Sequence, residues 1–221
     1  MTFTASNYIN VDGAWTNLTV ATITLWVKLN ALNATGAQRF IGSDDNWEVR
    51  ATTDWGGVWR FSNELWTSTV TQPPLARSTT IPTTGVWYHI AATVDATKFG
   101  QIFVNGILEA SGLGNDTATG NTLSIGNRNG AGANQCTNGL LDDVRVYTRV
   151  LGADEIATIY ACRGSDSIYF GLQNRWLLNE GPENAAASGA SIIKDMVGAR
   201  TGTPVSSPVW AGNFLKFRNW K

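Results

Sequence analysis

Hydrolysis of a glycosidic bond needs two carboxylates a few ångströms apart, so the acidic residues of this chain come first. Successive side chains on a β-strand point to opposite faces, and a catalytic pair on one strand must therefore stand at even spacing. Glu48, Glu64 and Glu109 each stand alone in their segments, and Asp142 and Asp143 are adjacent, which directs them to opposite faces. We therefore expect no catalytic residues and a protein that is not an enzyme.

The histidine and the cysteines restrict the chemistry further. His89 is the only histidine, so a Ser–His–Asp arrangement would have to use it. It lies within Trp87–Ala92, part of a predicted strand over Val86–Asp95, and we expect a structural histidine with satisfied hydrogen bonds. One histidine and the two cysteines, Cys136 and Cys162, do not make a zinc site. The cysteines leave two alternatives, a disulfide between them or two separate reduced thiols, and we favour the second.

Tryptophan offers a different chemistry, because an exposed indole can stack on the face of a sugar ring. Four tryptophans lie between positions 47 and 66. Trp55 is the best candidate, since the glycines of Asp54–Gly57 leave one face of its indole uncovered. Trp59 shares one strand face with Phe61 and is expected in the core. We predict a carbohydrate-binding site made of two tryptophans and a polar loop: Trp55, Trp47, Asp44, Asp45 and Asn46.

The elements that must position these residues are mostly strands. Alternation of apolar and polar residues, typical of half-buried strands, dominates the chain, and residues 19–28 are a clear example. Asn105-Gly106 separates two further strands and is a preferred turn of a tight hairpin, because both central residues need positive φ. Residues 153–161 form the one convincing amphipathic helix. The spacing predicts an all-β, two-sheet antiparallel jelly-roll sandwich with that short helix.

Three segments carry a resemblance to a known family. They are Asn138–Tyr147 with the helix after it, Trp87–Asp95, and Ile102–Leu108. Together they resemble the laminin G-like branch of the concanavalin A-like jelly rolls. The resemblance implies a domain that binds glycans or other surfaces, in a superfamily of which only some members are enzymes.

The resemblance also bears on two kinds of site. The glucanases of the superfamily carry Glu-x-Asp-x-x-Glu on one strand, and this sequence has no such cluster. Relatives often hold a structural calcium, for which Asp142 falls at the ligand position and carbonyls near Asn179–Gly181 would complete the oxygen set. Thr4 stands where the family often has Asp, so the alternative is that Asp142 only pairs locally, with Arg145. Beyond calcium, we expect no cofactor.

The C-terminal segment 171–221 resembles the opening strands of the same family. Gly171–Gly181 is similar to the usual first strand, while Phe214–Phe217 and Phe3–Val11 both resemble the second. The chain is then either one domain followed by a truncated copy, or a single circularly permuted domain over residues 1–221 in which Trp176–Asn179 pairs into a sheet. We favour permutation, because about 50 residues are too few to bury a jelly-roll core alone, and a missing first strand leaves an open edge.

Composition excludes other classes of function. The net charge is −1, with 16 basic and 17 acidic residues and no basic run, so we expect no nucleic-acid partner. No apolar run is long enough to span a membrane, and residues 1–8 lack the features of a signal peptide. Low charge with many threonines and aromatic residues fits β-structure and an extracellular or virion-surface location.

We therefore predict a non-catalytic surface-binding module of a phage or bacterial protein, lectin-like and specific for carbohydrate. Its partner is a glycan or a host or virion surface. The alternative is a virion structural protein, a capsid decoration or fibre subunit, that uses the jelly roll to assemble as a homo-oligomer or with a capsid partner. The absence of a leader favours the alternative, whereas the tryptophan cluster favours the lectin. A glycoside hydrolase ranks third.

Overall fold

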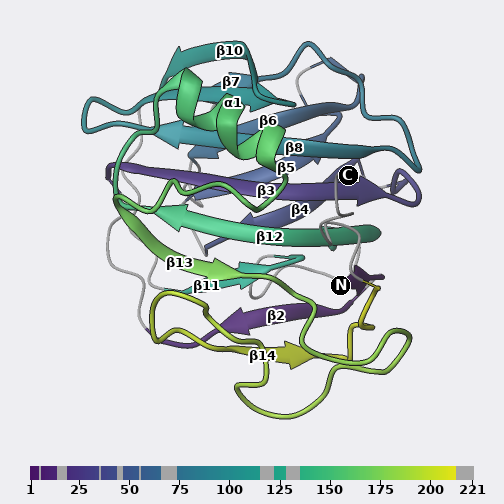
Figure 1. The fold of residues 1–221 in the computed structure, drawn as a ribbon. Coiled ribbons are helices and arrows are strands. Elements are labelled where there is room, and N and C mark those ends of the chain that lie inside the picture. Colours follow the sequence, from purple (N-terminus) through teal and green to yellow (C-terminus); the bar gives the residue numbers. More distant parts are fainter. Residues whose placement is uncertain are drawn as a thin grey trace, which may run out of the picture.

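The computed structural model of the protein describes residues 1–4, 6–13, 19–34, 36–43, 47–54, 56–65, 74–114, 122–127 and 135–212. Within these ranges the chain forms two antiparallel sheets of seven strands each and one helix (Figure 1). The predicted all-β sandwich is confirmed. No described helix has the length and apolar character needed to cross a membrane.

The two sheets are called sheet A and sheet B. In sheet A the strands run in the order β1 (Thr2–Phe3), β12 (Gly139–Tyr147), β3 (Ala21–Leu29), β8 (Trp87–Val94), β9 (Phe99–Val104) and β10 (Ile107–Leu113), and β13 (Leu172–Trp176) also pairs with β12. In sheet B the order is β14 (Gly202–Val205), β2 (Tyr8–Val11), β11 (Leu123–Ile125), β4 (Ala37–Gly42), β5 (Trp47–Thr52), β6 (Arg60–Leu65) and β7 (Ala76–Arg77).

The core lies between the sheets and follows from the alternation of each strand. Ile23, Leu25 and Val27 of β3 are buried in the same cluster as Val49 and Ala51 of β5. A fully buried Leu, Ile or Val contributes about 1.5–3 kcal/mol relative to its exposed state, so one inward row per strand suffices for a stable sandwich. The outward row of each strand is then left for other partners.

Two local predictions are confirmed, the hairpin and the helix. Asn105 and Gly106 both have positive φ, 51° and 80°, between the paired strands β9 and β10. The helix α1 (Ala153–Cys162) packs Ile156 and Ile159 against the outer face of sheet A. In Figure 1 it lies in front of that sheet, with sheet B behind.

The C-terminal segment contributes to both sheets. Trp176 of β13 pairs with Val144 of β12, and β14 pairs with β2. Trp176 therefore lies in a sheet, but the strand ends there, and Leu178 is buried outside it with a φ of 57°. The predicted pairing of Trp176–Asn179 thus holds only for its first residue. Circular permutation itself stays a prediction.

The alternative of a disulfide is wrong, because both cysteines are free. Cys136 is buried and forms a β-bridge with Arg39 of β4, in the layer of sheet B. Cys162 is the last residue of α1, on the outer side of sheet A. The two thiols therefore belong to different layers, and burial raises the pKa of the Cys136 thiol.

Candidate functional site

The outer face of sheet B carries an unusual density of charge. In β5, Trp47, Val49 and Ala51 point into the core, so the alternate residues Glu48, Arg50 and Thr52 point outward. In β6 the core residues Phe61 and Leu65 direct three others to the same outer face: Arg60, Ser62 and Glu64. Strand alternation alone therefore places a polar row on the outer side of this sheet. Arg60 is half-buried, whereas the other five side chains are each 7% exposed or less.

The register of the strands aligns these side chains in rows. One row crosses four strands as Arg39, Arg50, Ser62 and Arg77. In a neighbouring row Glu48 stands directly opposite Glu64. Cross-strand partners on one face lie close enough to interact. The sheet thus places a basic row beside an acidic pair.

These two rows form a continuous ion network. The Nε of Arg39 donates to Oε2 of Glu48 at 2.8 Å, and Arg50 forms ion pairs with Glu64 and with Asp54, the latter at 2.9 Å. Burial would lower the pKa of Arg50, but the charge of Glu64 and the weaker charges of Glu48 and Asp54 raise it. The guanidinium of Arg50 is therefore a permanent charge at the centre of the face.

The expectation that Glu48 and Glu64 are isolated is wrong, since they are opposite each other on adjacent strands. Spacing along one strand could not show this, because the pair is made by strand register. Both carboxylates are held by arginines. Glu64 also accepts a hydrogen bond from Ser62 Oγ at 2.6 Å. The pair is therefore built into an ion network rather than left free to exchange protons with a substrate.

The end of this face next to the β5–β6 turn is more open. Arg60 and Arg77 are half-buried, and Arg77 Nη2 donates to the carbonyl of Val58 at 2.5 Å. Burial, together with the like charge of Arg60, lowers the pKa of Arg77. Two arginines are thus held close together where the sheet meets solvent.

The predicted carbohydrate site is only partly described. Trp47 is wrong as a binding residue, because it is 2% exposed and its indole Nε1 donates to Asn63 Oδ1 at 2.6 Å inside the core. Trp55 and the loop residues Asp44, Asp45 and Asn46 lie outside the described residues.

Strand β5 lies in the sequence between the two predicted site segments and separates them. The Asp44–Asn46 loop joins β4 to β5, and the turn that contains Trp55 joins β5 to β6. Both adjoin β5, but at opposite ends, and its six residues span about 17 Å at ~3.4 Å per residue. The two segments therefore do not start from one end of the face, and only the turn adjoins Arg60 and Arg77.

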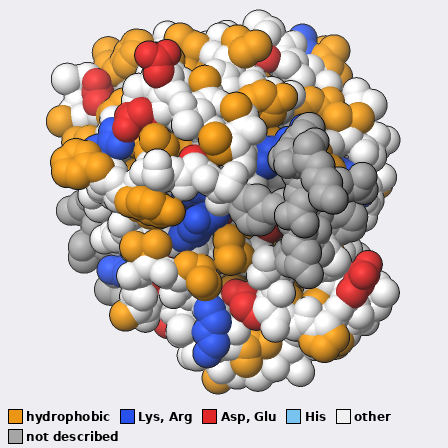
Figure 2. All heavy atoms as spheres, in the orientation of Figure 1, with side chains coloured by type: hydrophobic (Ala, Val, Ile, Leu, Met, Phe, Trp, Pro, Cys, Tyr) orange, Lys and Arg blue, Asp and Glu red, His pale blue; other side chains and the backbone are white. Residues whose placement is uncertain are grey.

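The outer face of sheet A holds a second ion cluster. Arg145 of β12 is 1% exposed and pairs with Asp143 at 2.6 Å and with Asp166 at 2.8 Å. Arg175 of β13 pairs with the same Asp143 at 2.7 Å. Sequence reasoning missed Asp166 and Arg175, which carry no motif. The visible surface over this sheet and α1 scatters charges of both signs among apolar side chains (Figure 2).

His89 lies on this same face and is buried, but it is not satisfied as predicted. Neither ring nitrogen has a hydrogen-bond partner in the described part of the chain, and its ring lies 5.3 Å from that of Trp26. Burial, reinforced by the charge of Arg145, lowers the pKa of His89 to about 3. The imidazole is therefore neutral, and no described geometry gives it a role in nucleophilic catalysis.

Asp142 lies beside the amino group of Met1. Its Oδ1 accepts a hydrogen bond from the amide of Asp143, while the Met1 amine donates to the carbonyl of Leu141 at 2.8 Å. Burial lowers the pKa of that amine to about 6, and the carboxylates of Asp142 and Glu180 oppose the shift. Asp142 and Glu180 thus both lie near the Met1 amine, and ligation of calcium by the carbonyls near Asn179–Gly181 stays a prediction.

The fit of calcium to these residues is incomplete. Calcium takes six to eight oxygens. No group of three or more acidic, histidine or cysteine side chains suited to a metal occurs within the described ranges. A site would need backbone carbonyls to complete it, and calcium at Asp142 stays a prediction.

Comparison with known proteins places the fold. A sequence model of the concanavalin A-like lectin/glucanases superfamily matches residues 3–157. The chain belongs to this family. The resemblance read from the motif strands is therefore confirmed. A search of curated proteins gave no match.

Solved structures with low identity share the jelly roll. A candidate carbohydrate-binding protein from Bacteroides ovatus is 20% identical with a TM-score of 0.72, over 96% of this chain but 61% of its own length. A heptameric pentraxin from Limulus polyphemus is 14% identical with a TM-score of 0.64, over 96% and 95%. The CBM40 domain of a Ruminococcus gnavus sialidase, bound to sialyllactose, is 17% identical with a TM-score of 0.52, over 72% and 95%.

Proposed function

We propose that this protein is a non-catalytic carbohydrate-binding module that acts at an extracellular or virion surface. The observation that carries the proposal is the polar outer face of sheet B, which ends at the β5–β6 turn beside Arg60 and Arg77. The half-buried guanidinium groups of these two arginines would supply hydrogen bonds to sugar hydroxyls, and an aromatic residue in the adjoining turn would supply stacking.

The rigidity of this face supports binding. Ser62 and Glu64 are held by hydrogen bonds, and Arg39, Arg50 and Glu48 by ion pairs. A ligand that meets preorganised groups avoids the entropic cost of ordering them. The similar structures from Bacteroides ovatus and Ruminococcus gnavus are a candidate carbohydrate-binding protein and a CBM40 domain bound to sialyllactose, which supports the proposal.

The arginine partners of Glu48 and Glu64 support a non-catalytic role. A glycosidase uses one carboxyl as acid and the other as base or nucleophile, which requires a proton on one of the pair. Here an arginine contacts each carboxylate. We expect no release of reducing ends from any glucan.

A second candidate, assembly into a particle or fibre, is favoured by one observation. The edge strand β10 exposes Ile107 at 68% and Leu113 at 66%, and no described strand pairs with its outer side. An exposed apolar edge is a surface on which another chain can add a strand. On this interpretation the jelly roll serves a capsid or fibre and glycan contact is secondary.

A glycan array followed by titration tests the proposal. Trp55→Ala should weaken binding of the best glycan about tenfold or more, because an aromatic contact adds on the order of 1 kcal/mol beyond area burial. Trp87→Ala, which removes a half-buried tryptophan on β8 of sheet A, is the matched control and should leave the dissociation constant unchanged.

Two outcomes would contradict the proposal. One is an array without any bound glycan. The other is a Trp87→Ala loss as large as the Trp55→Ala loss in folded proteins. Self-assembly on size-exclusion chromatography, abolished by Ile107→Lys, would then support the particle or fibre.

A further inference from the structure

We infer that Arg50, Arg60 and Arg77, here called the arginine rim, bind the acidic substituent of a sugar, a carboxylate or a sulfate ester. The inference rests on the proposed function and names the class of glycan. It would make the module selective for acidic over neutral polysaccharides.

Strand register brings the three arginines around one small residue. Ser62 of β6 stands opposite Arg50 of β5 on one side and opposite Arg77 of β7 on the other. Arg60 is two residues along the same strand, so it is a diagonal neighbour of both arginines, and such positions lie about 7–8 Å apart. Long arginine side chains at these positions can converge on one anion.

Donors in the rim remain unused. Within the described residues, Arg60 Nη1 is buried without a hydrogen-bond partner. Arg50 Nε has no hydrogen bond there either, but it forms an ion pair with Glu48 Oε2 at 3.9 Å. Arg60 forms no ion pair among these residues, whereas Asp54 and Glu64 are both paired with Arg50. Buried donors without acceptors are unfavourable, and an incoming oxyanion would satisfy them.

The charges of the rim favour an anion for a second reason. Burial, and after it the charge of Arg60, lowers the pKa of Arg77, while the carboxylates of Glu64 and Asp54 oppose the shift. An anion between two such groups removes their repulsion and gains charge-assisted hydrogen bonds. The planar guanidinium matches the two oxygens of a carboxylate or a sulfate in a bidentate contact.

The β5–β6 turn leaves a way in for a ligand. A Cβ added at Gly57 would meet no atom within 4 Å, and at Gly56 its nearest neighbour would be Arg77 Nη1 at 3.6 Å. Asp54 is exposed at the same turn. The rim is thus open to solvent at the half-buried Arg60 and Arg77, whereas Arg50 is only 7% exposed. Arg145 on the other face differs from all three, because Asp143 and Asp166 engage its guanidinium completely.

Matched pairs of sugars test the inference. Comparing the binding of polygalacturonate with that of its full methyl ester measures the contribution of the carboxylate. Comparing 3′-sulfated lactose with lactose measures the contribution of the sulfate. We expect one acidic member to bind at least about tenfold more tightly than its neutral partner, a preference that declines with added salt. The double substitution Arg60→Gln with Arg77→Gln should reduce that ratio to about one.

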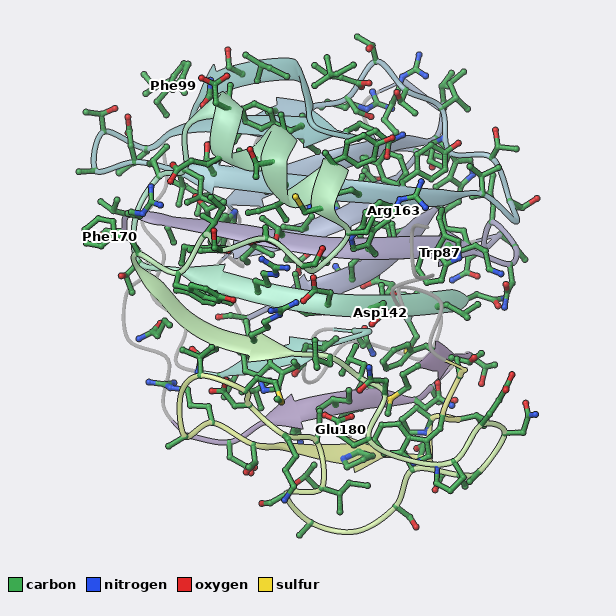
Figure 3. All side chains as sticks on the ribbon, in the orientation of Figure 1. Trp87, Phe99, Asp142, Arg163, Phe170 and Glu180 are labelled. Carbon is green, nitrogen blue, oxygen red and sulfur yellow. The ribbon has the colours of Figure 1, made fainter. Side chains whose placement is uncertain are left out.

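Two further variants keep the test independent of folding. Arg163→Gln removes the same charge from the exposed end of α1, on the far side of the sandwich, and should leave the ratio unchanged (Figure 3). Arg60→Lys with Arg77→Lys retains the charge but loses the planar fork, and should give an intermediate ratio. Thermal melts establish that each variant is folded.

The outcomes separate this inference from the proposed function. Equal binding of acidic and neutral members, or an acidic preference that survives in the folded double Gln variant, overturns the inference and leaves the carbohydrate-binding function in place. Binding of no sugar, on these pairs or on the array, overturns both.

Discussion

The two outer faces of the sandwich use arginine differently. On sheet A, Arg145 lies beneath its partners Asp143 and Asp166, and both ends of its guanidinium are engaged. On sheet B, Arg50 is equally well paired, but its neighbour Arg60 has no ion pair in the described residues, and Arg60 Nη1 has no hydrogen-bond partner there. One network is closed by the chain itself, whereas the other remains open at its rim.

This difference separates a structural charge cluster from a candidate binding surface. Buried arginines occur on both faces, so burial alone does not identify a site. A cluster whose donors all have partners within the chain cannot bind a ligand, so a substitution in it should reduce stability without changing recognition. A substitution in a cluster that keeps a donor without a partner should change recognition with little loss of stability. Substitutions on each face test this difference.

The largest effect is expected for Arg145→Leu. It leaves the buried carboxylates of Asp143 and Asp166 without their partner, and the loss of one member of a buried ion pair costs about 3–5 kcal/mol. Urea denaturation measures this loss. Arg60→Leu, the matched substitution on sheet B, should cost less than about 1 kcal/mol, because no ion pair is broken.

Recognition should show the reverse order in the same two proteins. Folded Arg145→Leu should keep the dissociation constant of the best glycan, whereas Arg60→Leu should not. Similar losses of stability in both variants would mean that the two networks are energetically alike. The comparison would then fail.

A calcium titration tests whether Asp142 of β12 binds a metal ion. If Asp142 binds calcium, the metal should stabilise the folded state by about 2.7 kcal/mol at a hundredfold excess over its dissociation constant. The melting temperature should rise with calcium and fall with chelator, and Asp142→Asn should abolish both shifts. A wild-type melt that does not respond to chelator removes calcium from this site.

Much of the fold could be predicted because its signals are local. Alternation in residues 19–28 and the Asn105-Gly106 turn each depend on neighbours in sequence. The helix near 153–161 is equally local, and the structure places it at Ala153–Cys162. These elements could be predicted without knowing their tertiary contacts.

The site residues were harder because they depend on contacts between distant segments. Trp47 was assigned to the surface from a cluster of tryptophans, but the inward row of β5 includes it. Glu48 meets Glu64 only through the register of two strands, and Arg145 meets Asp166 across 21 positions of chain. No spacing rule within one segment reports such pairs.

The smallest effect, and the finest test of closure on sheet A, concerns acid. The pKa of His89 is about 3 in the folded protein and 6.5 ordinarily, mainly because of burial and then because of the charge of Arg145. As the pH falls from 6.5 towards 3, His89 is protonated in the unfolded chain but stays neutral in the folded protein. The free energy of unfolding therefore falls by about 1.4 kcal/mol per pH unit. Urea denaturation between pH 6 and 4 measures this slope, above the range in which the Asp166 carboxyl, whose pKa is lowered, gains its proton. His89→Phe keeps an aromatic ring beside Trp26 and should flatten the slope. An equal slope in wild type and variant would mean that another group takes up the proton on unfolding. His89 would then be accessible to water in the folded protein rather than buried beneath α1.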